Sequence, residues 1–156
     1  SVIPLFLKMR QTGAIPITDR RMTRFWITLE QGVGLVIRGL DLMHGGEIFV
    51  PKVPSMNIVD LAEAIAPGCR HEIVGIRPGE KLHEVLLTED ESARALDLGE
   101  MFLVKPNFPW WGERSWSEGA PLPAGFRYSS DSNESWLTPD ELREMVLPLA
   151  ADAAGA

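Results

Sequence analysis

Residue types that form cross-links and catalytic groups are scarce in this sequence. Its 156 residues include one cysteine, one tyrosine and three histidines. The single Cys69 cannot form a disulfide within the chain, and such cysteine usage is typical of a reducing cytoplasm. No apolar run is long enough to span a bilayer, and no signal-peptide pattern opens the chain. The sequence therefore predicts a cytoplasmic protein with no membrane contact.

Patterns for cofactor binding and for nucleophilic catalysis are also missing. The segment "GVGLVIRG" (32–39) has its third glycine too late for a dinucleotide-binding loop, and it lies within a predicted helix. We interpret these glycines as small residues that allow close helix packing. Tyr128 has Ser132 where a Tyr-x-x-x-Lys pair needs lysine, and no histidine has a triad context. We expect no cofactor and no catalytic residue in this chain.

A metal site is not expected either. Cys69 and His71 are spaced like a pair of ligands, but structural zinc requires four.

Basic residues are scarce in the second half of the chain. Residues 1–84 carry ten Lys and Arg against nine Asp and Glu, whereas residues 85–156 carry five against thirteen. This acidic balance argues against nucleic-acid binding, which normally uses a basic face. Three arginines do gather in "TDRRMTRFWI" (18–27). They could bind a small anionic ligand through their planar guanidinium groups, or pair with the acidic half of the molecule.

Short helices and short strands alternate along the chain, which predicts a small mixed α/β domain. Capping-box patterns at Thr28, Thr88 and Thr138 indicate three helix starts. Residues 106–127, rich in Pro, Trp and Gly, predict an irregular loop. We expect one domain over 1–150 and a frayed tail over 151–156. Helices are predicted over 3–13, 28–43, 55–67, 88–99 and 138–149, and strands over 14–18, 45–52, 71–76 and 101–106.

The segment "VGIRPGEKLHE" (74–84) brings charged and turn-forming residues to the end of a predicted strand. Pro78 restricts Arg77 to an extended backbone, and Gly79 allows a sharp turn. Arg77 is then presented where α/β folds commonly bind ligands. Arg77 for a phosphate and Glu80 for a ribose diol would fit one nucleotide. The alternative is an ordinary solvated turn.

Several segments in order along the chain resemble the C-terminal half of the extended short-chain dehydrogenase/reductase family. The likeness is greatest to the inverting UDP-N-acetylglucosamine 4,6-dehydratases and related polysaccharide-biosynthesis proteins. The matching segments are "SVIPLF", "ITDRRMTRFWITLEQGV", "GGEIFVPKVPSMNIVDLAEAI", "VGIRPGEKLHE", "PNFPWW" and "YSSDSNESWLTPDELREMV". The resemblance implies a substrate-binding part that grips a UDP-sugar. It also implies six binding residues, with Arg24 and Arg77 at the diphosphate, Glu80 at the ribose, and Val2, Ile17 and Thr18 at the uracil.

In this family an N-terminal Rossmann domain holds NAD(P) and the catalytic residues, and that domain precedes the part that the chain resembles. We therefore expect a fragment of a UDP-sugar 4,6-dehydratase, a lyase, that is inactive by itself and has the Rossmann domain as its partner. The alternative is a non-enzymatic remnant that serves as an interaction or oligomerisation module. Trp110, Trp111 and Trp116 would suit a partner surface, although packing within a loop explains them equally well. A homo-oligomer is a further expectation.

Overall fold

The computed structural model describes residues 2–108 and 116–154, and it divides into two compact units. The first unit comprises residues 1–25, 54–84 and 133–156, and the second comprises 26–53 and 85–132. Each unit thus combines segments that are distant in the sequence. The sequence patterns, by contrast, predict one domain. Among the described residues, no helix has both the length and the apolar character needed to cross a membrane.

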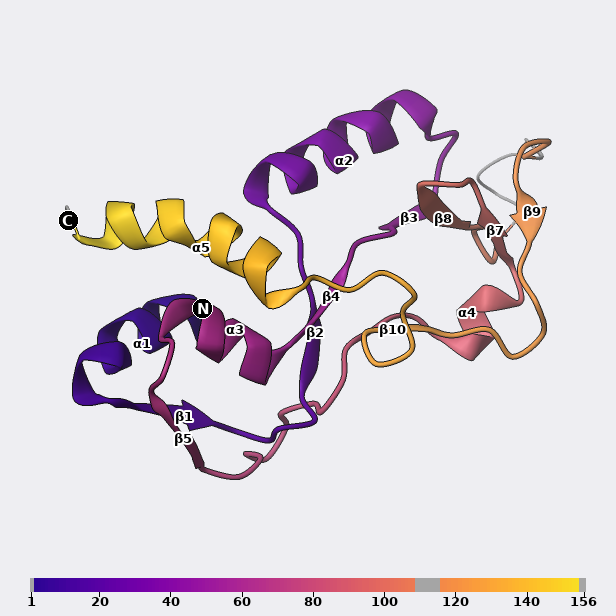
Figure 1. Ribbon diagram of the computed structural model, residues 1–156. Coiled ribbons are helices and arrows are strands. Elements are labelled where there is room, and N and C mark those ends of the chain that lie inside the picture. The colour runs from indigo at the N-terminus through magenta and orange to yellow at the C-terminus, as the bar shows by residue number, and fades with distance from the viewer. Residues whose placement is uncertain (1, 109–115, 155–156) are drawn as a thin grey trace. The chain divides into compact units, whose positions relative to one another are not determined.

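The first unit places two pairs of strands beside three helices (Figure 1). Strand β1 pairs with β5 in parallel, and β2 pairs with β4 antiparallel. Helix α3 packs against both α1 and α5. The buried side chains of Phe6, Ile15, Ile17, Leu61 and Leu142 form its core. Its elements are α1 (Val2–Met9), the 3₁₀ helix η1 (Arg10–Thr12), β1 (Ala14–Ile17), β2 (Thr23–Phe25), β4 (Ser55–Asn57), α3 (Ile58–Ile65), β5 (Arg70–Ile73) and α5 (Pro139–Ala154).

The second unit is built on a four-stranded antiparallel sheet with the strand order β3-β8-β7-β9. Every residue of β8 is buried, as expected for a central strand. Strands β10 and β6 form a separate antiparallel pair. Tyr128, which begins β10, ties this pair to the chain after β3, because its hydroxyl accepts from Val53 N and donates to Val53 O. The elements are α2 (Leu29–Leu42), β3 (Ile48–Pro51), β6 (Val85–Leu87), α4 (Glu89–Ser92), β7 (Ala95–Asp97), β8 (Met101–Val104), β9 (Ala120–Pro121) and β10 (Tyr128–Ser129).

The three predicted capping boxes are confirmed. In α2 the Thr28 hydroxyl accepts from Gln31 N at 3.2 Å, and the Gln31 side chain accepts from Thr28 N at 2.9 Å. Thr88 and Thr138 make the same reciprocal pair with the glutamate three residues on. Each box satisfies backbone N–H groups that have no partner within the helix.

Two predicted helices are partly strand in the structure. Residues 55–57 form β4, and α3 begins only at Ile58, where the Asn57 side chain accepts from Val59 N at 2.8 Å. The helix predicted over 88–99 ends at Ser92, and residues 95–97 join the sheet as β7. Strand pairing overrides the local helical pattern in both places: β4 pairs with the distant β2, and β7 forms a hairpin with the adjacent β8. Helix α5 continues to Ala154, past the predicted end at 149. The predicted mixed α/β class is confirmed.

Candidate functional site

The candidate site lies in the first unit, at the carboxyl ends of two parallel strands. Ile17 ends β1 and pairs with Ile73, which ends β5. Because the strands are parallel, the residues after them leave the sheet at the same edge. The backbone N–H of Val74 donates to the Ile17 carbonyl at 2.9 Å, which extends the pairing by one residue. Thr18 and the segment 74–84, here called the 74–84 loop, are thereby brought together.

A tight turn lies at the tip of the 74–84 loop. Glu80 N donates to the Arg77 carbonyl at 3.0 Å, with Pro78 second and Gly79 third in the turn. Gly79 has a φ of +83°. Proline at the second position and a positive φ at the third define a type II turn, which favours glycine there. The expectation that Pro78 and Gly79 form a sharp turn is confirmed.

The Glu80 carboxylate holds this turn in place. One oxygen accepts from Arg77 N at 3.2 Å, and the other accepts from the Thr18 hydroxyl at 3.4 Å. Three of the predicted site residues therefore meet at one point. The Thr18 contact is long for a hydroxyl hydrogen bond, so a ligand hydroxyl could take its place at little cost.

The positively charged side chain of Arg77 remains available to a ligand in this arrangement. Its side chain is exposed, and its guanidinium group has no hydrogen-bond or ion-pair partner within the part of the chain that the structure describes. A guanidinium group can bind phosphate oxygens through two parallel hydrogen bonds. Arg77 is thus available to an anion beside the Glu80 carboxylate.

Arg24 holds the base of the 74–84 loop. Its guanidinium donates to the carbonyls of Lys81 at 2.8 Å and Leu82 at 3.1 Å, and also to that of Thr23 at 2.7 Å. Arg24 Nε lies 3.7 Å from a Glu84 carboxylate oxygen. The side chain is only 23% exposed. Arg24 is predicted to contact the diphosphate, but in the structure its guanidinium group donates to backbone carbonyls. The main effect of these contacts is to fix the loop.

Thr23 and His83 also fix this loop, although no sequence pattern predicts it. Thr23 N donates to the Leu82 carbonyl at 3.1 Å, and the Thr23 hydroxyl lies 2.8 Å from Nδ1 of His83. Both contacts depend on β2, which spans three residues and is too short for a periodic sequence signal. The position of His83 directly after the turn motif was the only available hint.

The two predicted uracil-site residues outside the turn lie in packed parts of the first unit. The Ile17 side chain is fully buried, and its carbonyl accepts from Val74 N. Val2 begins α1, which packs against β1, and its side chain is half-buried. Any contact from Ile17 to a ligand would therefore come from its backbone.

The alternatives for the arginine cluster are resolved for Arg21. Its side chain donates twice to the Asp19 carboxylate, at 3.0 and 2.8 Å, and its backbone N–H donates to the same group at 2.8 Å. These hydrogen bonds lower the pKa of Asp19 to about 2. Arg21 thus pairs with Asp19, two residues before it, and not with the acidic half of the chain.

The glycines of residues 32–39 do not fit a dinucleotide cofactor. All three lie inside α2, where backbone N–H groups bond along the helix and cannot point at a pyrophosphate. Close packing, the alternative interpretation, holds for Gly39, where an added Cβ would lie 3.4 Å from the Phe49 ring. Gly32 and Gly34 face open space.

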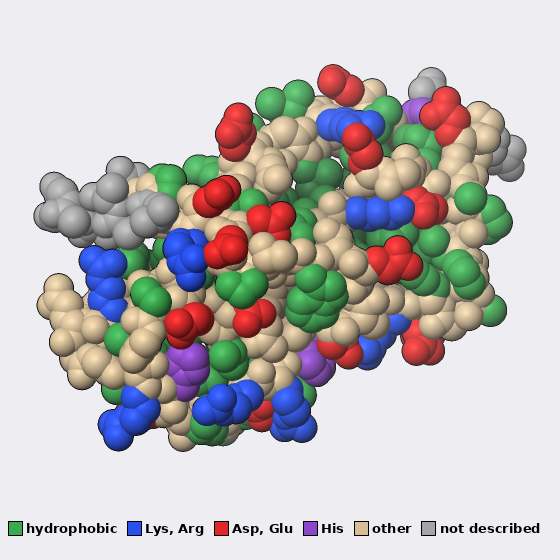
Figure 2. Space-filling model, in the orientation of Figure 1, with side chains coloured by type: hydrophobic (Ala, Val, Ile, Leu, Met, Phe, Trp, Pro, Cys, Tyr) green, Lys and Arg blue, Asp and Glu red, His purple; other side chains and the backbone are tan. Residues whose placement is uncertain are grey.

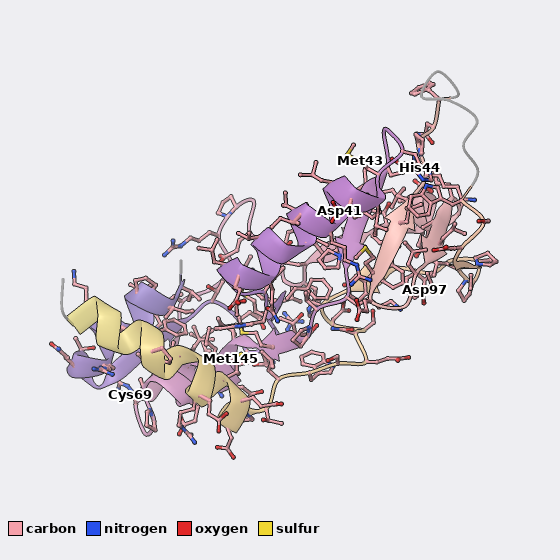
Figure 3. The ribbon with its side chains drawn as sticks, turned by 90° about the horizontal axis from the view of Figure 1, so that it is seen from above. Asp41, Met43, His44, Cys69, Asp97 and Met145 are labelled. Atoms are coloured by element: carbon pink, nitrogen blue, oxygen red, sulfur yellow. The ribbon has the colours of Figure 1, made fainter. Side chains whose placement is uncertain are left out.

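One of the three candidate interface tryptophans anchors a turn in the second unit. Trp116 Nε1 donates to the Glu47 carboxylate at 3.1 Å, and its ring stacks on His44 with centroids 4.7 Å apart. His44 lies just beyond the end of α2 (Figure 3). Trp110 and Trp111 lie outside the described residues. Packing within a loop is therefore the interpretation that fits Trp116.

Cys69 and His71 do not form part of a metal centre in the described ranges. The Cys69 thiol lies 3.6 Å from the Arg10 carbonyl, within reach of a weak S–H hydrogen bond. Nowhere in residues 2–108 and 116–154 do three His, Cys, Asp or Glu side chains gather to hold an ion.

Comparison with known proteins shows to which family the chain belongs. Residues 1–106 match the family model described as "Polysaccharide biosynthesis protein". The chain is 44% identical over 155 residues to a UDP-N-acetylglucosamine 4,6-dehydratase (inverting) of Campylobacter jejuni, covering 94% of this chain and 46% of that protein. It is 33% identical over 159 residues to a UDP-glucose 4-epimerase of Rickettsia bellii, covering 96% and 46%.

A solved structure agrees with these relatives. The fold matches the X-ray structure of Pen from Bacillus thuringiensis with a TM-score of 0.79 and 34% identity, over 96% of this chain and 46% of that one. The chain thus spans about half the length of the relatives it matches. The resemblance noted in the sequence is confirmed, and the chain belongs to the polysaccharide biosynthesis protein family.

Proposed function

We propose that this chain is the substrate-binding part of a UDP-N-acetylhexosamine 4,6-dehydratase-like enzyme, located in the cytoplasm, and that it binds the UDP moiety. Residues 1–150 would form this substrate domain. The observation that carries the proposal is the guanidinium of Arg77, which has no partner among the described residues and is held by a turn at the carboxyl ends of β1 and β5. The 44% identity to an inverting dehydratase supports the choice of ligand.

Four of the six predicted residues receive a role that their surroundings permit. Arg77 would neutralise charge on the diphosphate, since it is exposed and has no partner within residues 2–108 and 116–154. Glu80 would accept from a ribose hydroxyl, with Thr18 releasing its long contact to that carboxylate. Arg24 would act mainly by holding the 74–84 loop, because its donors already meet carbonyls of that loop.

Catalysis in this proposal depends on residues outside the chain. By the family resemblance, a Rossmann domain would hold NAD(P) and the groups that move protons. This part would contribute binding energy and the position of the substrate, both of which lower the barrier when the whole enzyme assembles. The chain by itself is then expected to bind UDP and to dehydrate no sugar.

Calorimetric titration of UDP into the chain tests the proposal. We expect binding that weakens about tenfold in Arg77→Ala, because a charge-assisted phosphate contact is lost. Uridine, which lacks the diphosphate, should bind weakly to both proteins. Arg143→Ala is the matched control, since Arg143 pairs with Asp140 on the surface of α5.

The outcomes separate the two functions that the sequence leaves open. Equal UDP affinity in the Arg77 and Arg143 variants would contradict the assigned phosphate contact. A folded chain that binds no UDP, alone or fused to the Rossmann part of the C. jejuni dehydratase, would contradict the proposal as a whole. That second outcome would favour a non-enzymatic interaction module.

A further inference from the structure

Helix α2 of the second unit carries an apolar face that nothing in the described structure covers. The side chains of Leu29, Val33, Val36, Ile37 and Leu40 are each more than half exposed, and Leu29 reaches 86%. Their spacing of four, three, one and three residues is that of one face of an α-helix. We call these five side chains the α2 stripe. Figure 2 shows apolar side chains at the surface over α2, beside acidic and basic ones.

The helix has a second apolar face, which is the one packed within its own unit. Gly39 lies against the Phe49 ring, and Leu35 and Leu42, on the same side by helical spacing, are half-buried. Polar residues occupy a third side, where Arg38 forms an ion pair with Glu100. A surface helix normally needs one apolar face and one polar face. Two apolar faces indicate a helix that packs between two bodies.

The extent of the α2 stripe sets it apart from ordinary surface residues. Single exposed leucines are common, but five apolar side chains in one row along a helix mark an interaction surface. Gly32 lies beside this row and faces open space, so a partner could approach the helix backbone closely there. Met43, 46% exposed, continues the apolar surface beyond the end of α2 (Figure 3).

We propose that the α2 stripe docks the companion domain that completes these enzymes, and that it does so through apolar packing. The chain accounts for 46% of the matched dehydratase, epimerase and Pen chains, so each of them holds more than as much protein again outside the matched part. That remaining part is the occupant to which we commit. The inference rests on the proposed function in one respect, since it treats the chain as part of a larger enzyme.

Thiol labelling at the helix surface tests this docking without UDP and without activity. In a Cys69→Ser background, Val33→Cys and Leu40→Cys would report on the α2 stripe, and Asp41→Cys would report on its polar side. In the chain by itself all three thiols should react fast. In a fusion with the companion part of the C. jejuni dehydratase, labelling of the two stripe thiols should slow by about tenfold or more. The labelling rate of Asp41→Cys should not change.

Three results would overturn the proposal. Equal stripe labelling in the chain and in a folded fusion would show that the companion part binds elsewhere. Slow labelling that depends on chain concentration would show that a second copy covers the stripe. Slow labelling in the chain by itself at every concentration would show that the chain covers its own stripe.

A second pair of variants guards against misfolding. Val36→Thr keeps the shape of the side chain, and Ile37→Thr keeps the branch at Cβ but is smaller. Because both positions are exposed, the far-ultraviolet circular dichroism of the two variants should match that of the parent chain. In the fusion, both should restore faster labelling at Leu40→Cys. Failure of UDP binding would leave these readouts unaffected, so the two proposals can fail separately.

Discussion

At the scale of single residues, two arginines of identical chemistry have different surroundings. Arg24 is mostly buried and meets carbonyls of the 74–84 loop, whereas Arg77 is exposed and free within the described ranges. The first position favours stability and the second favours ligand binding. Substitutions at the two sites should therefore separate these effects.

Arg24→Ala should lower the free energy of unfolding by about 1–3 kcal/mol, because charge-assisted hydrogen bonds to partly buried carbonyls are lost. Arg77→Ala should change it by less than about 0.5 kcal/mol, as expected for an exposed side chain without a partner. Urea denaturation of both variants measures the difference. Similar losses in the two proteins would contradict the anchoring role of Arg24.

The turn at the tip of the loop gives a second prediction. Gly79→Ala should lower the free energy of unfolding by about 1–2 kcal/mol, because a φ of +83° disfavours any Cβ, although open space surrounds this position. Gly34→Ala also enters open space, but in a helix, where alanine should raise stability by about 0.5–1 kcal/mol. Thermal melts of the two variants should thus shift in opposite directions.

At the scale of elements, the capped helix starts follow local signals, whereas two short strands form where the local pattern favours helix. The boxes at Thr28, Thr88 and Thr138 need only residues three positions apart. Strand β7 exists because β8 pairs with it, and β4 exists because β2 does. This is why the capping boxes could be predicted, whereas strands over 55–57 and 95–97 could not.

Helix α5 provides the test at this scale. Thr138→Ala should lower the free energy of unfolding by about 0.5–2 kcal/mol, because the first turn loses its side-chain cap. The buried Leu142 and Val146 would transmit that loss to the core of the first unit. Thr138→Ser should retain most of the stability, since it keeps the hydroxyl. Chemical denaturation of the two variants compares them directly, and equal losses would show that the hydroxyl is not what stabilises the helix start.

At the scale of the whole molecule, acid should destabilise the fold. Hydrogen bonds from Arg21 lower the pKa of Asp19 from 3.8 to about 2. Burial would raise the pKa of Glu47, but hydrogen bonds from the backbone of Gly45, Glu47 and His44 and from the Trp116 side chain outweigh it, so this pKa is lowered as well. A carboxyl group with a lowered folded-state pKa stabilises the protein above its unfolded pKa, and that stability is lost as the pH falls through the folded value.

We therefore expect the free energy of unfolding to fall between about pH 4 and pH 2, the interval set by Asp19. Asp60 opposes this trend in part, because burial raises its pKa. Denaturant titrations at several pH values measure the loss. Asp19→Asn should make it shallower, and a parent protein whose stability is flat across this interval would contradict the expectation.

Of the candidate site, the sequence predicted the turn of residues 77–80 and the open position of Arg77. Proline and glycine restrict the backbone through their own covalent structure, so their effect is local. The sequence did not predict that Arg24 and Thr23 fix the loop. Those contacts join residues about sixty positions apart, and only the parallel pairing of β1 with β5 and the docking of β2 bring them together.

The sequence by itself thus determined the mixed α/β class, the three capped helix starts, the turn and the family of this protein, because each depends on neighbouring residues or on ordered motifs. The tertiary structure decided which polar groups were already engaged and which apolar faces were covered. It assigned Arg21 to Asp19 and Trp116 to Glu47, and it left the α2 stripe exposed. Burial and pairing depend on where distant segments meet, and no local pattern of residues encodes that meeting.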